Sequence, residues 1–160
     1  MRRLAAIVVA IETVLRAIAA LCLAVMAALV VLQVILRYGF GAGSIFTEEI
    51  ARYAMIWMAL FASAVAAREG SHIRIDLVPS ILSQLAPRCS KLLACLIDVL
   101  SLTIFLVLLW WGVDMVVFAV AQTSEGLRLP LAYPYAAVPV AFAFASIFAL
   151  ARLALQDMRA

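Results

Sequence analysis

Long apolar runs separated by short charged stretches are the feature of this sequence that most restricts its fold. No charged residue occurs from Ala17 to Leu36 or from Tyr53 to Ala67, and two further apolar runs lie nearer the C-terminus. A transmembrane helix needs roughly 20 predominantly apolar residues. Charged residues make up only 13% of the 160 residues, against about 25% in an ordinary soluble domain. The sequence therefore predicts an integral membrane protein.

We predict an all-α integral membrane protein in which residues 1–160 form a single four-helix membrane domain. A short amphipathic lead that contains Glu12 and Arg16 is expected before the first span. Between the second and third spans, Pro79 suits a helix start and Pro87 a helix stop, which predicts a short interfacial amphipathic helix. The four transmembrane helices are expected at about 14–36, 48–67, 91–120 and 131–151.

Basic residues are divided unequally between the two sides of these spans. Of the 12 Lys and Arg residues, nine lie at the two ends of the chain or between the second and third spans. Cytoplasmic connections carry the excess of Lys and Arg in membrane proteins. We therefore expect a multi-pass protein with both termini cytoplasmic. The three basic residues on the opposite side are Arg37, Arg52 and Arg128.

Two acidic residues and one arginine open the second span on its predicted outer side. Glu48 lies one turn before Arg52, the favourable order for an i,i+4 pair, and Glu48 and Glu49 fall in the first turn, where the helix dipole favours negative charge. Arg52 lies about one turn inside the apolar run, where a charge is costly. We therefore treat these three residues as a candidate contact site, and interpret Arg68 and Arg74 as marks of the lipid boundary.

Four other side chains stand out within the spans. Gln33 suits a hydrogen bond to a neighbouring helix as well as it suits transport. Asp98 and Asp114 are about 160° apart around the third helix, at ~100° per residue, so they cannot form one acidic site. They form either a proton relay or a pair of acids bonded to neighbouring helices, the interpretation that we favour. Trp57, in the middle of the second span, either packs against protein or faces lipid.

The sequence offers no pattern of catalytic or metal-binding residues. Its three cysteines, Cys22, Cys89 and Cys95, form no CxxC motif, and its one histidine, His72, lies at the predicted cytoplasmic exit of the second span. A membrane enzyme would need paired histidine or acidic groups at one depth. Basic residues are not clustered or interleaved with aromatic ones, as nucleic-acid binding would require. We predict no catalytic, substrate-binding, metal or cofactor site, and no nucleic-acid partner.

The region that begins at Arg37 resembles the small membrane subunit of tripartite ATP-independent periplasmic (TRAP) transporters. The resemblance covers residues 37–77, and its most specific part is Glu-Glu-x-x-Arg followed, after one membrane crossing, by His-Ile-x-Ile-Asp. Phe46 is a departure, because the family often has tryptophan there. The resemblance marks these residues as candidates for a subunit interface or a structural role: Arg37, Tyr38, Glu48, Glu49, Arg52, Trp57, His72 and Asp76.

The resemblance implies a non-catalytic subunit of a tripartite secondary transporter in the bacterial inner membrane. It implies that this subunit is a scaffold for a large multi-span permease, which carries substrate and sodium. The transported molecule would be an organic acid, most often a carboxylate, delivered by a periplasmic binding protein. The alternative is a self-sufficient small homo-oligomeric transporter or channel. That alternative needs a polar residue near the midplane, and Gln33, Asp98 and Asp114 are poorly placed for it by depth.

Overall fold

The computed structural model describes residues 2–41, 45–69 and 87–157, and the protein is helical over most of them. In these ranges, four helices are long and apolar enough to cross a membrane, which confirms the prediction of an all-α protein with four transmembrane helices. The interfacial helix predicted from Pro79 falls outside the described residues. The helices are α1 (Arg2–Gly39), α2 (Ile45–Glu69), α4 (Pro87–Ala119), α5 (Ala132–Tyr135) and α6 (Ala137–Asp157).

Helices α1, α2 and α4 begin earlier than the predicted spans. The amphipathic lead with Glu12 and Arg16 is not separate, because α1 runs unbroken through it, and the i,i+4 ion pair between these two side chains stabilises the helix there. Pro87, predicted to end the interfacial helix, is the first residue of α4, and the residues before it lie outside the described ranges. Proline suits this position, since the first N–H of a helix has no partner within it.

The last apolar run is divided between α5 and α6, with the break at Ala136. Pro139 has no N–H to donate to the turn before it, so a regular helix cannot continue there without losing a bond. Gly112 of α4 lies against this region, and an added Cβ would come within 3.1 Å of Val138 Cγ1 and 3.2 Å of Pro139 Cδ. The absent side chain of Gly112 therefore lets α4 approach the start of α6 closely.

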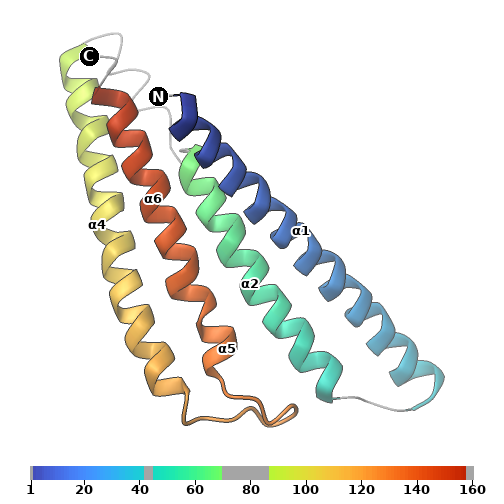
Figure 1. Ribbon diagram of the computed structural model, residues 1–160. Helices are drawn as coiled ribbons and strands as arrows, with labels where there is room; N and C mark the ends of the chain where they lie inside the picture. The colour runs from blue at the N-terminus through green and yellow to red at the C-terminus, as the bar shows by residue number, and fades with distance from the viewer. Residues whose placement is uncertain (1, 42–44, 70–86, 158–160) are drawn as a thin grey trace.

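The long helices lie side by side in the order α1, α2, α6, α4 (Figure 1). Helices α2 and α6 are distant in sequence but adjacent in space, so the two halves of the chain pack together in the middle of the bundle. Both chain termini lie at one end, which we call the termini end. The other end carries the connection between α4 and α5, residues 120–131, and we call it the loop end.

A core of small and aromatic side chains joins α1, α2 and α6. Trp57 packs against this core and makes an edge-to-face contact with Phe61, with 5.2 Å between ring centroids. Alanines on α6 allow the helix backbones to approach closely, as is usual in membrane bundles. The buried core residues are Leu15, Phe61, Ala64, Val65, Ala67, Ala141, Ala145 and Phe148.

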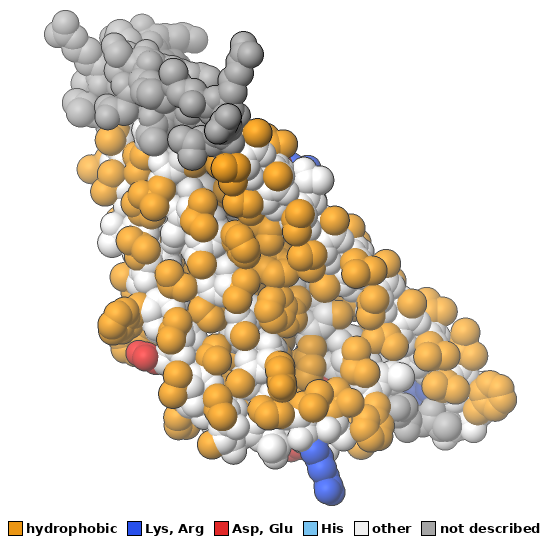
Figure 2. Space-filling model, in the orientation of Figure 1, with side chains coloured by type: hydrophobic (Ala, Val, Ile, Leu, Met, Phe, Trp, Pro, Cys, Tyr) orange, Lys and Arg blue, Asp and Glu red, His pale blue; other side chains and the backbone are white. Residues whose placement is uncertain are grey.

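The outer faces of α1 and α4 are apolar. Figure 2 shows hydrophobic side chains over most of the visible face between the two ends, with charged side chains at only a few places. On α2, Arg52 and Arg68 are 16 residues apart, and the same interval separates Asp98 and Asp114 on α4. Each interval is about 24 Å at a rise of ~1.5 Å per residue. The charges of these two helices thus lie in two layers, one near each end.

Candidate functional site

Charged side chains in the described part of the chain form three tethers between segments that are distant in sequence. One is at the loop end and centres on Glu49. Two are at the termini end and centre on Asp98 and Glu12. A buried charge is retained in a fold only when it is paired and hydrogen-bonded. The position of each partner therefore shows which helices the charges hold together.

The loop end is closed by a short hairpin formed by residues 120–131. The backbone N–H of Ser124 donates to the carbonyl of Leu129 at 2.9 Å, and that of Leu131 donates to the carbonyl of Gln122 at 2.9 Å. Arg128, near the tip, has a backbone φ of 52°. Residues other than glycine rarely adopt this left-handed backbone conformation. The backbone bonds on both sides of the tip maintain this conformation.

Glu49 fixes this hairpin to the start of α2. Its Oε2 accepts hydrogen bonds from the backbone N–H groups of Gly126, at 3.0 Å, and Leu127, at 2.9 Å. Its Oε1 accepts one from the Tyr53 hydroxyl, and the Ser124 hydroxyl also donates to this carboxylate. Hydrogen bonds to an ionised acceptor are the stronger kind. Glu49 is therefore the residue that binds residues 120–131 to α2.

Gly126 is required by this contact. A Cβ at position 126 would lie 2.5 Å from Glu49 Oε2 and 2.9 Å from Ile45 Cγ2. Both distances are too short for a Cβ to fit unless the Glu49 carboxylate or the Ile45 side chain shifts. The sequence alone did not indicate this tether, because Glu49 and Gly126 are 77 residues apart.

Glu48 and Arg52 form the predicted i,i+4 pair on the outside of α2. Arg52 Nη2 lies 3.4 Å from Glu48 Oε1, and the two side chains are 63% and 59% exposed. The neighbouring acids therefore have different environments, since Glu49 contacts the hairpin and Glu48 faces away from the chain. An exposed pair of this kind contributes only ~0.3–0.5 kcal/mol to the helix.

Asp98 is fully buried and pairs with Arg152 of α6. Arg152 Nη2 binds the carboxylate, and Nη1 donates to the carbonyl oxygen of Ala67 at 3.3 Å, so the arginine joins α4, α6 and the end of α2. Asp114 lies in the same helix but is exposed. The sequence analysis used Arg152 only as one of the basic residues that predict the orientation in the membrane. The need of Asp98 for a cation was the signal that could have identified its partner.

Glu12 joins α1 to α2 at the termini end. It is buried, and its Oε1 accepts hydrogen bonds from Arg16 Nε at 3.0 Å and Nη2 at 2.7 Å. Its Oε2 forms an ion pair with Arg68 Nη1. Arg68, which we interpreted as a mark of the lipid boundary, thus also connects two helices.

The remaining predicted residues that the structure describes take no part in these three tethers. Arg37 is exposed near the C-terminal end of α1, and the adjacent Tyr38 is 84% exposed. Gln33 is half-buried in α1. His72 and Asp76 lie outside the described residues. Within the described ranges, no group of three or more His, Cys, Asp or Glu side chains could hold a metal ion.

Comparison with known proteins adds a family and two relatives. The family model described as the DctQ component of tripartite ATP-independent periplasmic transporters matches residues 26–159. An isethionate TRAP transporter permease protein, DctMQ, from Oleidesulfovibrio alaskensis is 34% identical over 117 residues, 72% of this chain and 18% of the relative. A protein from Haemophilus influenzae named as a TRAP transporter small permease protein is 38% identical over 80 residues, 50% of this chain and 48% of that relative. The chain thus spans less than half of the length of either relative.

Proposed function

The chain belongs to the DctQ component family of tripartite ATP-independent periplasmic transporters, and from this membership we propose that it is a rigid, non-catalytic scaffold for a large permease. The observation that carries this proposal is the set of three tethers. Glu12 joins α1 to α2, Arg152 joins α2, α4 and α6, and Glu49 joins α2 to the hairpin. Together they connect every long helix of the described chain. A single four-helix membrane domain held at both ends is suited to support a moving partner.

The proposed partner is a large multi-span permease. One relative is named as a permease protein, DctMQ, and this chain matches only 18% of its length. A longer permease that contains a part similar to this chain supports the proposal that the chain works beside a much larger membrane protein. The apolar outer faces of α1 and α4 are available for such a contact.

The proposed transported substrate is an organic acid. We propose sodium-coupled uptake, with a periplasmic binding protein that delivers the substrate, most often a carboxylate, to the complex. The relative from Oleidesulfovibrio alaskensis is named for isethionate, which is an organic sulfonate. A small anion with one acid group is the chemistry that carboxylate and sulfonate substrates share. Substrate and sodium would bind to the large permease.

The proposed orientation puts both termini and the termini end of the bundle in the cytoplasm of a bacterium, with the hairpin in the periplasm. In a variant without the native cysteines, a single cysteine at Gly41 or Glu125 should react with a membrane-impermeant thiol reagent added to intact spheroplasts. A cysteine at Ser71, which lies outside the described residues, should react only after the membrane is opened. The reverse pattern would contradict the orientation that the basic residues predict.

The exposed Glu48–Arg52 pair is the proposed contact with the large permease. A permease helix that packs on this pair would bury it, and stranding one member of a buried ion pair costs roughly 3–5 kcal/mol. We therefore expect Arg52→Ala to reduce co-purification with the permease and substrate uptake by at least tenfold. Membrane insertion should be unchanged. Arg52→Lys should restore part of the activity, since lysine lacks the planar group that binds a carboxylate at two points. The measurement is uptake together with the yield of the co-purified permease.

Glu48→Gln should weaken assembly in the same way as Arg52→Ala, whereas Arg128→Gln is the matched control, because Arg128 is also exposed at the loop end but lies in the hairpin. If Arg52→Ala and Glu48→Gln both behave as the wild type does, this pair is only a lipid boundary and the proposed contact is wrong. Uptake by the isolated chain in liposomes would instead support the alternative of a self-sufficient small transporter.

A further inference from the structure

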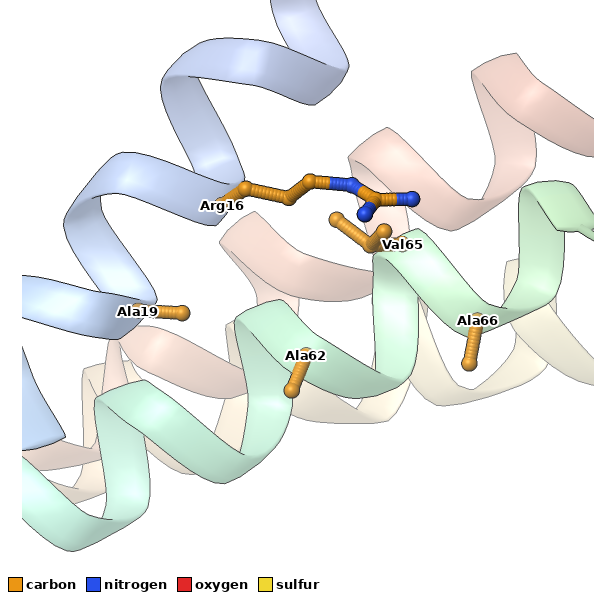
Figure 3. A pocket seen from close by; sticks show the side chains of 5 residues that line it. All are labelled: Arg16, Ala19, Ala62, Val65 and Ala66. Atoms are coloured by element: carbon orange, nitrogen blue, oxygen red, sulfur yellow. The ribbon is translucent and has the colours of Figure 1, made fainter.

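An open pocket lies between α1 and α2 on the outside of the bundle, near the termini end. Its volume is about 230 Å³, and it is lined by Arg16 and Ala19 of α1 and by Ala62, Val65 and Ala66 of α2. Figure 3 shows the side chain of Arg16 reaching across from α1 toward α2, with the short side chains of the three alanines around it. Small side chains on both helices leave this space unfilled.

The pocket changes from polar to apolar along the direction of the helices. Arg16 lies at the termini end, beside Glu12, to which Arg68 also binds. Arg68 is the last but one residue of α2, and Ala62 lies six residues closer to the middle, a distance of about 9 Å. A phospholipid in one leaflet has the same order, with its charged headgroup at the surface and its acyl chains toward the middle.

The polar end of the pocket carries two arginines. Arg16 and Arg68 both bind the carboxylate of Glu12. The Arg16 side chain is 54% exposed even while it contacts Glu12, so a ligand can reach it. Basic pockets between transmembrane helices are known to bind anionic lipid headgroups.

We propose that this pocket binds one membrane phospholipid. The lipid phosphate lies against the Arg16 guanidinium, and part of an acyl chain fills the space beside Ala19 and Ala62. The bound lipid covers the seam between α1 and α2 at the point where small residues leave it open. This proposal goes beyond the scaffold function and does not depend on it, because lipid binding is measured on this chain without any transport assay.

The test uses the full chain in liposomes, both alone and assembled with its permease, and a phosphatidylglycerol that carries a photoreactive diazirine on one acyl chain. After illumination and trypsin digestion, the label is measured on the peptide Tyr53–Arg68, which contains the α2 side of the pocket. We expect saturable labelling that unlabelled phosphatidylglycerol suppresses. A diacylglycerol with the same acyl chains, or inorganic phosphate, should not suppress it, because the site needs the phosphate and the chain together.

Arg16→Gln should weaken labelling about fivefold, since one basic residue near a membrane surface contributes ~1 kcal/mol to anionic lipid binding. This variant keeps Arg68 as a partner for Glu12, so the helix contact is preserved. Ala62→Leu should abolish saturable labelling by filling the pocket. The matched controls are Arg37→Gln, at the other end of α1, and Ala28→Leu, an exposed alanine of α1 outside the pocket. Both should label as the wild type does.

Three results would overturn the proposal. Equal labelling of the peptide in all variants would mean that the label comes from the bulk lipid around the protein and not from a lipid in the pocket. Equal suppression by diacylglycerol would show that the phosphate is not recognised. Labelling of the isolated chain that disappears in the assembled transporter would show that a protein helix, rather than a lipid, occupies the pocket.

Discussion

Asp98→Ala or Arg152→Ala should each destabilise the bundle by roughly 3–5 kcal/mol, because either change removes one member of an ion pair between α4 and α6 whose carboxylate is fully buried. Asp98 is fully buried, and Arg152 is its ion-pair partner and also donates to the Ala67 carbonyl oxygen of α2. Loss of the pair therefore loosens the contacts of α6 with both α4 and α2. The measurement is thermal unfolding of the purified protein in mild detergent, which should shift to a clearly lower temperature for both variants.

The double variant Asp98→Leu with Arg152→Leu should recover most of the lost stability. Well-packed apolar residues can replace a buried ion pair at little cost or even with a gain. Asp114→Ala is the matched control, since it removes the same residue type from the same helix at an exposed position, and it should unfold as the wild type does. If Asp98→Ala is no more destabilising than Asp114→Ala, the Asp98–Arg152 tether does not hold α4 to α6.

Glu49→Ala is expected to release the hairpin from α2. The change removes the acceptor of the Gly126 and Leu127 N–H groups and of the Tyr53 hydroxyl. A loss of ~2 kcal/mol, within the range of ~1.5–3 kcal/mol for one hydrogen bond to a charged group, would raise the population of the open hairpin about 30-fold. Trypsin cleavage after the exposed Arg128 measures that population when opening and closing are fast, so its rate should rise by a similar factor.

Gly126→Ala should have the same effect by a different route, because its Cβ would collide with Glu49 Oε2 and with Ile45. Two controls separate this contact from general damage. Gly39→Ala adds a methyl group where nothing lies within 4 Å, and Glu48→Ala removes the adjacent, exposed carboxylate. Neither should change the cleavage rate. Rapid cleavage of the Glu48→Ala variant, or slow cleavage of Glu49→Ala, would contradict the tether.

The sequence predicted the helices well because membrane helices are determined by local composition. A run such as Tyr53–Ala67 must be helical in a bilayer whatever lies beside it. The helix ends were less well predicted. Glu12 and Arg16 were taken as a lead outside the membrane helix, although their i,i+4 pair stabilises α1 through that region.

The tethers were not predictable in the same way, because each joins segments that are distant in sequence. The Glu48–Arg52 pair followed from spacing within one helix. By contrast, Glu49 and Gly126 meet only because α2 and the hairpin are adjacent at the loop end. The sequence favours a bond between Asp98 and a neighbouring helix, but many basic residues could have supplied the partner. The order of helices, α1, α2, α6, α4, selects Arg152, and periodicity does not reveal that order.

The spacing of charges along α2 and α4 has a consequence for the lipid around the protein. The uncharged part of α2, Tyr53–Ala67, is about 22 Å long, whereas a typical hydrocarbon core is ~30 Å thick. Arg68 is held by Glu12, and Asp98 by Arg152, so these charges stay at a fixed depth.

The uncharged part of α1, Ala17–Leu36, is about 30 Å long, and Figure 1 shows α1 slanting away from α4. A short α2 beside a long, tilted α1 creates hydrophobic mismatch. A short hydrophobic span is accommodated by thinning of the bilayer, by flanking charges that extend toward the interface, or by association with another helix. A partner that covers α2 and α4 would relieve the mismatch by the last route.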